Sequence, residues 1–75
     1  MSRVHTLVFE TTHHALWAEE VAREMRLGAE VVPAPAAARA GCDLAIAVLD
    51  EDFETFLGEL RERGINVRVF EPKPA

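Results

Sequence analysis

The chain has 75 residues, one cysteine, and a formal net charge of −5 from 13 acidic and 8 basic side chains. A chain this short buries only about 60% of the surface that its unfolded form exposes, so its core is small. We therefore expect a single domain over residues 1–75 that holds no cofactor. The excess of acid excludes nucleic acid and anionic membranes as main partners, because both select clustered Lys and Arg. One cysteine also excludes an internal disulfide and a multi-thiolate zinc site, and we expect no metal.

The same features predict a cytoplasmic protein. No stretch approaches the roughly 20 apolar residues that a membrane span requires. Residues 1–3 lead directly into a strand pattern, so we expect no signal peptide. A lone cysteine fits a reducing compartment. At the other end, residues 71–75 form a polar tail that we expect to fray.

The first elements are a strand and a helix. Val4–Phe9 is β-branched and aromatic, which is typical of a strand. Apolar residues then recur at helical spacing, which predicts a helix near residues 12–27. Thr12 or Thr11 suits the N-cap, because a hydroxyl there accepts from a free backbone N–H group. Gly28 suits the position after the helix, where glycine adopts a left-handed conformation at no steric cost.

A connection rich in proline and alanine follows the second strand. Ala29–Val32 predicts a short strand that ends at Pro33. Pro33 and Pro35 cannot donate hydrogen bonds to a sheet, which favours a connection or an edge over residues 33–40. Gly41 ends this segment.

The second half repeats the order of the first. Leu44–Leu49 is apolar throughout, as in a central strand covered on both faces. Apolar residues at positions 53, 56, 57 and 60 predict a helix near residues 52–63, which Gly64 ends. Residues 65–69 alternate between apolar and polar side chains, which predicts a half-exposed strand.

Two similar βαβ halves predict an α+β fold of the ferredoxin-like βαββαβ type. We expect a four-stranded antiparallel sheet of order 4-1-3-2, with two helices on one face. In this topology the start of the third strand lies beside the end of the first. Cys42 is then expected next to residues 10–13, at the N-terminus of the first helix.

Cys42 is the candidate functional residue. It stands between Gly41 and Asp43, where the connection becomes a strand, and lone cysteines are more often kept for reactivity than for packing. The alternative is a buried and inert thiol. A helix N-terminus attracts anions, so we expect an accessible thiol supported by Thr11, Thr12 and His13. The Asp43 carboxylate would oppose this effect.

The histidines of the first helical turn leave two interpretations open. His13 is either a solvated residue or a member of the site, because imidazole titrates near neutral pH. His14 lies on the apolar side of the helical wheel, which favours a packed residue at the edge of the core.

These residues together resemble a known family. The pattern consists of Phe9-x-x-Thr12-His13, then Pro33-x-Pro35, then Gly41-Cys42-x-Leu44-Ala45. It is similar to the small selenium/sulfur carrier protein family, formerly a domain of unknown function, and it covers nearly the whole chain. The resemblance implies a cytoplasmic protein whose cysteine carries the element as a persulfide or perselenide. Asp43 departs from the pattern, in which we expect glycine after the cysteine.

The leading hypothesis is therefore a carrier without catalytic turnover, which meets a sulfur- or selenium-donor protein and an acceptor protein. An alternative is a non-catalytic regulatory or interaction module, because ferredoxin-like sheets expose an apolar face that suggests a homodimer or a docked partner. A third is delivery of a soft metal through Cys42 and a histidine, which would need further ligands from a partner.

Overall fold

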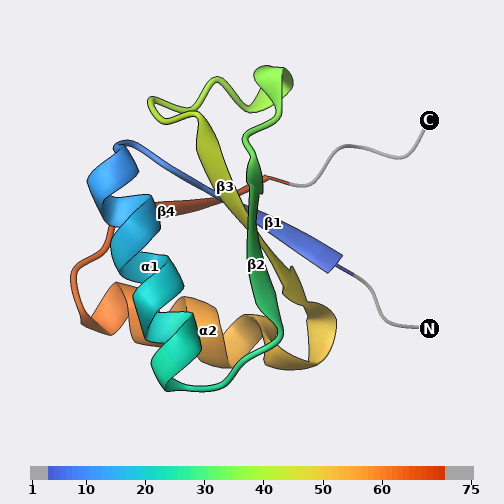
Figure 1. The fold of residues 1–75 in the computed structure, drawn as a ribbon, viewed down its shortest axis with the longest axis vertical. Helices are drawn as coiled ribbons and strands as arrows, with labels where there is room; N and C mark the ends of the chain where they lie inside the picture. Colours follow the sequence, from blue (N-terminus) through green and yellow to red (C-terminus); the bar gives the residue numbers. More distant parts are fainter. Residues whose placement is uncertain (1–3, 71–75) are drawn as a thin grey trace.

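The computed structural model of the protein describes residues 4–70, which form one sheet and two long helices (Figure 1). The sheet has the order β2-β3-β1-β4 and all three strand pairs are antiparallel. This arrangement confirms the predicted ferredoxin-like fold. The expected tail, 71–75, lies outside the described residues. In chain order the elements are β1 (Val4–Phe9), α1 (Thr12–Glu24), β2 (Ala29–Pro33), the 3₁₀ helix η1 (Ala36–Ala38), β3 (Leu44–Leu49), α2 (Asp50–Glu62) and β4 (Val67–Phe70).

The register of the central strands brings the end of β1 beside the start of β3. Val8 pairs with Ala45, and Val4 pairs with Leu49 at the other end. The edge strand β2 reaches the same end of the sheet, where Pro33 pairs with Leu44. The connections after β1 and before β3 therefore meet at one end of the molecule, as the topology predicted.

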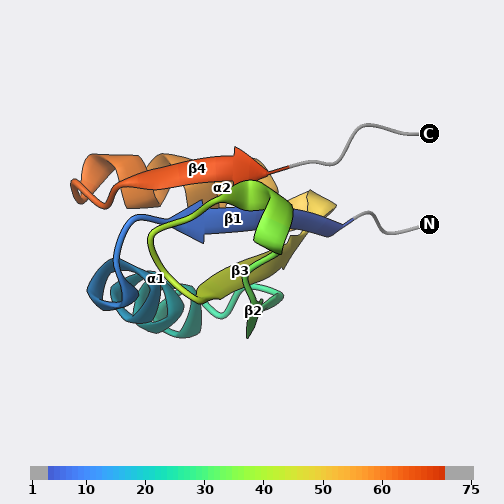
Figure 2. The same ribbon diagram turned by 90° about the horizontal axis from the view of Figure 1, so that it is seen from above.

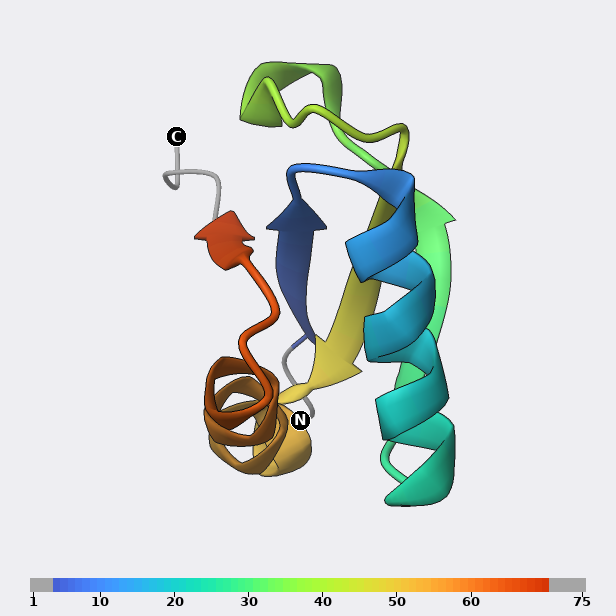
Figure 3. The same ribbon diagram turned by 90° about the vertical axis from the view of Figure 1, so that its left-hand side faces the viewer.

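Both helices pack on one face of the sheet, and their apolar stripes form the main core. Figure 3 shows α1 lengthwise beside the sheet and α2 almost end-on. Phe56 and Leu60 of α2 are fully buried there, as are Ala18 and Val21 of α1. Each large side chain buried in this way contributes about 1.5–3 kcal/mol to the stability of the fold. The strands supply alternate residues to this core, namely Leu7, Phe9, Ile46 and Val48.

The opposite face of the sheet is covered in part by the connection between β2 and β3. We call residues 34–41 the strap; Figure 2 shows it reaching from β2 across to β4 before the chain returns to β3. Ala38 of the strap is 3% exposed and packs against Val8 and Ala45, which are buried beneath it. The Arg68 guanidinium of β4 donates to the Ala38 carbonyl oxygen at 2.6 Å. The chain itself thus covers β3 on both faces near its start.

The predicted end of the first helix is wrong by three residues. The helix ends at Glu24, and Arg26, not Gly28, adopts the left-handed conformation with φ 57°. The backbone N–H groups of Arg26 and Leu27 donate back to the last helical turn, which closes a Schellman motif. Gly28 has another reason to be glycine, since a Cβ there would lie 2.6 Å from a Leu49 side-chain carbon.

The second helix matches its prediction more closely. It begins at Asp50, two residues before the expected start, with three acidic residues in its first turn. Gly64 has φ 78°, and it ends the helix in a second Schellman motif through bonds from Gly64 and Ile65. The Asp52 carboxylate accepts from the Gly28 backbone N–H at 2.8 Å, which ties the start of α2 to the start of β2.

Candidate functional site

Cys42 lies in the turn between the strap and β3, and its sulfur makes two hydrogen bonds. The thiol donates to the Thr12 hydroxyl oxygen at 3.5 Å, and the Leu44 backbone N–H donates to the sulfur at 3.2 Å. The residue is 4% exposed and belongs to the same core cluster as Phe9 and Ala15. The topology therefore brings Thr12 and Cys42 into contact, although 30 positions separate them in the chain.

Two expectations about this thiol are wrong. We expected an accessible sulfur at the N-terminus of the first helix, and the structure shows a buried one. The backbone N–H that reaches the sulfur belongs to Leu44 of β3, not to the first turn of α1. Thr11 is the N-cap, and its hydroxyl already accepts from the His14 backbone N–H at 3.2 Å. The Thr11 side chain therefore caps the N-terminus of α1, and the Cys42 side chain points into the core.

Gly41 fixes the position of the turn that carries the thiol. A Cβ on Gly41 would lie 2.4 Å from the Glu10 carbonyl oxygen, so only glycine lets the turn approach the end of β1 this closely. Asp43 is exposed, and its carbonyl oxygen accepts from the Ala34 backbone N–H at 2.8 Å. This hydrogen bond joins the two ends of the connection between β2 and β3, and Cys42 directly precedes Asp43.

The prolines and histidines named above fall in different places. Pro33 is the last residue of β2, and Pro35 precedes η1 as its N-cap. His13 is exposed, and among residues 4–70 no hydrogen bond joins it to Cys42. His14 is half-buried, and its Nδ1 accepts from the Asn66 backbone N–H at 3.1 Å. The interpretation of His14 as a residue packed at the edge of the core is confirmed.

A comparison with known proteins identifies the family of this chain. Residues 5–70 match the family model described as "Putative Se/S carrier protein-like". The chain belongs to this family. No curated protein and no solved structure matches it. The resemblance seen in the sequence is therefore confirmed, and the contacts around Cys42 are those of a member of the Se/S carrier family.

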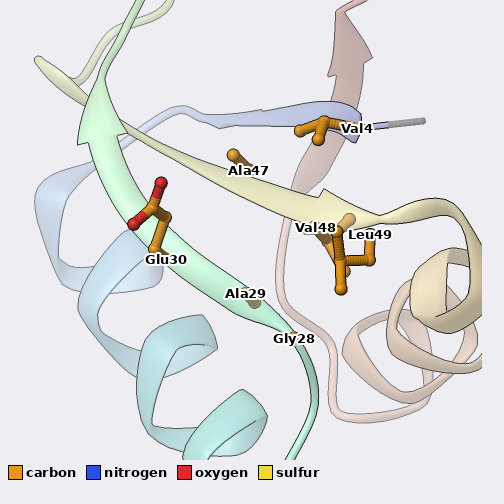
Figure 4. Close-up of a pocket in the computed structure, with 7 residues that line it drawn as sticks. All are labelled: Val4, Gly28, Ala29, Glu30, Ala47, Val48 and Leu49. Carbon is orange, nitrogen blue, oxygen red and sulfur yellow. The ribbon is translucent and has the colours of Figure 1, made fainter. Parts of the chain in front are cut away.

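Other features of this family member bear on the alternatives. Within the described residues, no group of three or more His, Cys, Asp and Glu side chains could hold a metal ion. No helix in that part of the chain is long and apolar enough to cross a membrane. A hollow of about 240 Å³ lies at the far end of β3 from Cys42 (Figure 4). It is lined by Val4, Gly28, Ala29, Glu30, Ala47, Val48 and Leu49.

Sequence reasoning missed one group at the thiol and one at the strap. The Leu44 N–H donates to the sulfur two residues back, and no side-chain pattern signals a backbone donor. Arg68 holds the strap through the Ala38 carbonyl oxygen. The alternation of the last strand places Arg68 on the face away from the helices, but it does not indicate that the strap lies there.

Proposed function

We propose that this member of the Se/S carrier family holds sulfur or selenium on Cys42 as a persulfide or perselenide. The observation that supports the proposal most directly is the pair of hydrogen bonds on the only sulfhydryl of the chain, within the residues that match the family. The proposal includes a cytoplasmic location, a donor protein and an acceptor protein.

The transfer step is an exchange between two sulfur atoms. The Cys42 thiolate attacks the terminal sulfur of a donor persulfide, and a new bond forms from Sγ to that atom. The bond between the terminal sulfur and the donor's own sulfur breaks, and the donor leaves as a thiolate that takes up the proton lost by Cys42. No net oxidation occurs, so no further reactant is needed. Selenium transfers in the same way, with selenium as the atom under attack.

The two groups that contact the Cys42 sulfur can form hydrogen bonds with both the thiol and the thiolate. The Leu44 N–H donates whether the sulfur is protonated or not. The Thr12 hydroxyl accepts from the thiol, and it can rotate to donate once the sulfur is negative, because a hydroxyl has both capacities. With only one cysteine in the chain, no second thiol can attack the adduct and release the cargo as a disulfide.

Mass spectrometry of the intact protein tests this function. After incubation with glutathione persulfide, we expect a mass increase of one sulfur atom that maps to Cys42 and is absent from Cys42→Ser. Thr12→Val should retain less adduct than Thr12→Ser, because only serine keeps the hydroxyl beside the sulfur. An unmodified Cys42 in the folded wild-type protein, with adduct on a free cysteine peptide in the same solution, would contradict the proposal.

The hollow in Figure 4 favours a second candidate function, the docking of another copy of the chain. Val4 at its edge is 58% exposed, and the half of the sheet face beyond the strap carries Val4, Ala47 and Leu49, with Glu30 beside them. A two-fold contact would place these same apolar residues of both copies against each other. Light scattering at micromolar concentration should then report a dimer, and Val4→Glu should return it to a monomer. A wild-type monomer at every concentration would exclude this function.

A further inference from the structure

The outer side of α1 exposes two large apolar side chains that are neighbours in the chain. Among residues 4–70 the exposed large hydrophobic side chains are Val4, Leu16 and Trp17, of which Leu16 is 49% and Trp17 is 36% exposed. Together with His13 and Glu20, Leu16 and Trp17 line an open hollow of about 400 Å³, which we call the α1 hollow. The buried stripe of α1 lies on the other side of the helix, so packing of the core does not account for these exposed side chains.

Contacts with its neighbours hold Trp17 in a fixed orientation. Its indole ring packs edge-on against the His14 imidazole, with ring centroids 6.0 Å apart. The imidazole is itself held by the Asn66 backbone N–H, which donates to Nδ1. Trp17 therefore loses little conformational freedom when a partner covers it, and tryptophan is enriched among the residues that dominate binding energy at protein interfaces. These properties favour Trp17 as an anchor for another protein.

The α1 hollow adjoins the part of the surface that covers Cys42. Thr12 is exposed, and its hydroxyl oxygen is in contact with the buried sulfur. Figure 3 shows the first turn of α1 beside the turn that leads into β3. Leu16 follows Thr12 by four residues, so the two side chains are neighbours on the surface of the helix. A protein that docks on the α1 hollow therefore extends to the exposed residue that contacts the sulfur.

The exposed charges around the α1 hollow and around Cys42 are acidic. Glu10, Glu20 and Asp43 are exposed, and none of them forms an ion pair within residues 4–70. Arg23 of α1 already pairs with a glutamate of the same helix at 3.5 Å. Arg68 contacts the strap, on the face of the sheet away from the helices. Charge complementarity therefore selects a partner with basic side chains around its apolar contact.

We propose that the α1 hollow is the docking surface for the sulfur-donor protein, which presents apolar side chains ringed by Lys and Arg beside its persulfide. The inference rests on the proposed function, since a donor is needed only if Cys42 takes up sulfur. Leu16 and Trp17 supply the affinity, and the acidic rim orients the donor and speeds its association. Docking raises the effective concentration of the persulfide beside Cys42, where the exchange with the Cys42 thiolate follows.

The fluorescence of Trp17 reports directly on docking, because the chain has one tryptophan and no tyrosine. The probe is a helical peptide with leucines on one face, flanked by lysines, and the control peptide has glutamate in place of each lysine. The lysine peptide should shift the emission to shorter wavelength and bind about ten-fold more tightly than the control, less so at high salt. Equal binding of both peptides, or no response, would overturn the proposal. An emission that shifts with the concentration of the protein alone would also overturn it, because a second copy would then occupy the α1 hollow.

Matched variants locate the contact on α1. Leu16→Ser should weaken binding of the lysine peptide about ten-fold, whereas Leu16→Met, which keeps an apolar side chain, should bind nearly as well as the wild type. Glu20→Gln should weaken binding about two-fold and reduce its dependence on salt. Glu54→Gln makes the same change in net charge at an exposed position of α2 and should bind as the wild type does. The proposal is overturned if Leu16→Ser binds as tightly as the wild type, or if the two glutamate variants behave alike.

Sulfur transfer then tests the role of the docked protein as a donor. The lysine peptide, extended by a cysteine persulfide, should load Cys42 about ten-fold faster than glutathione persulfide, which has no apolar surface to dock. Leu16→Ser should reduce the ratio of the two rates, measured by mass spectrometry of the intact protein. If glutathione persulfide loads Cys42 and the peptide loads it no faster, the docking proposal is wrong and the proposed function stands. Failure of both donors would contradict the proposed function, and the donor role with it, even where the peptide binds.

Discussion

The turn that carries Cys42 depends on the absence of a side chain at Gly41. In Gly41→Ala the new Cβ would lie 2.4 Å from the Glu10 carbonyl oxygen and 3.3 Å from its carbon, and both are backbone atoms that cannot rotate away. Gly41 does not have a positive φ, so the cost arises from this contact and not from backbone conformation. Overpacking of this kind costs about 1–3 kcal/mol. In a domain of this size each kcal/mol lowers the Tm by about 4–8 °C.

Gly58→Ala is the matched control, because it adds the same methyl group inside α2 with nothing within 4 Å. Alanine in a helix interior is favoured over glycine by about 0.5–1 kcal/mol, so this variant should be more stable than the wild type. Urea unfolding followed by far-UV circular dichroism measures both variants. The reasoning is refuted if Gly41→Ala is as stable as the wild type, because the contact with Glu10 would then be relieved at no cost.

Three further changes test separate parts of the structure. Arg26→Gly should raise the free energy of unfolding by about 1 kcal/mol, because the left-handed conformation that ends α1 is strained for arginine; an unchanged Tm would contradict this. Asp52→Ala should lower the free energy of unfolding by about 1 kcal/mol through the lost bond from the Gly28 N–H, whereas Asp52→Asn, which keeps an acceptor, should lose less in the same urea titration. His13→Ala should leave the alkylation rate of Cys42 unchanged, since the imidazole makes no hydrogen bond to the thiol, and a slower rate would place His13 in the site.

The fold was predictable because each element has a pattern that tertiary contacts reinforce. The apolar run 44–49 predicted a central strand, and the helical spacing at positions 53–60 predicted the buried stripe of α2. The end of the first helix was not predictable in the same way. The sequence pattern predicts that Gly28 ends it, but the Schellman bonds form two residues earlier and impose a left-handed conformation on Arg26. Gly28 lies instead against the Leu49 side chain, which a Cβ at this position would displace.

The candidate site was predictable only at the level of topology. Antiparallel pairing of β1 with β3 was enough to bring Thr12 and Cys42 together. The direction of the cysteine side chain could not be predicted from this pairing, because it depends on how the turn closes against Glu10. Nor does any periodicity show that residues 34–41 fold back over the sheet, since a segment of alanine and proline has no apolar stripe that marks the surface it covers.

The two edge strands have a consequence for the behaviour of the protein at high concentration. β2 ends at Pro33, which has no N–H group to offer to an incoming strand, and β4 has four residues within the described part of the chain, with the charged Arg68 among them. Short strands, prolines and charges at sheet edges all oppose the strand-to-strand addition that leads to fibrils. Concentrated solutions of the native protein should therefore remain free of amyloid, although a hollow lined mainly by apolar residues is open at one end of the sheet.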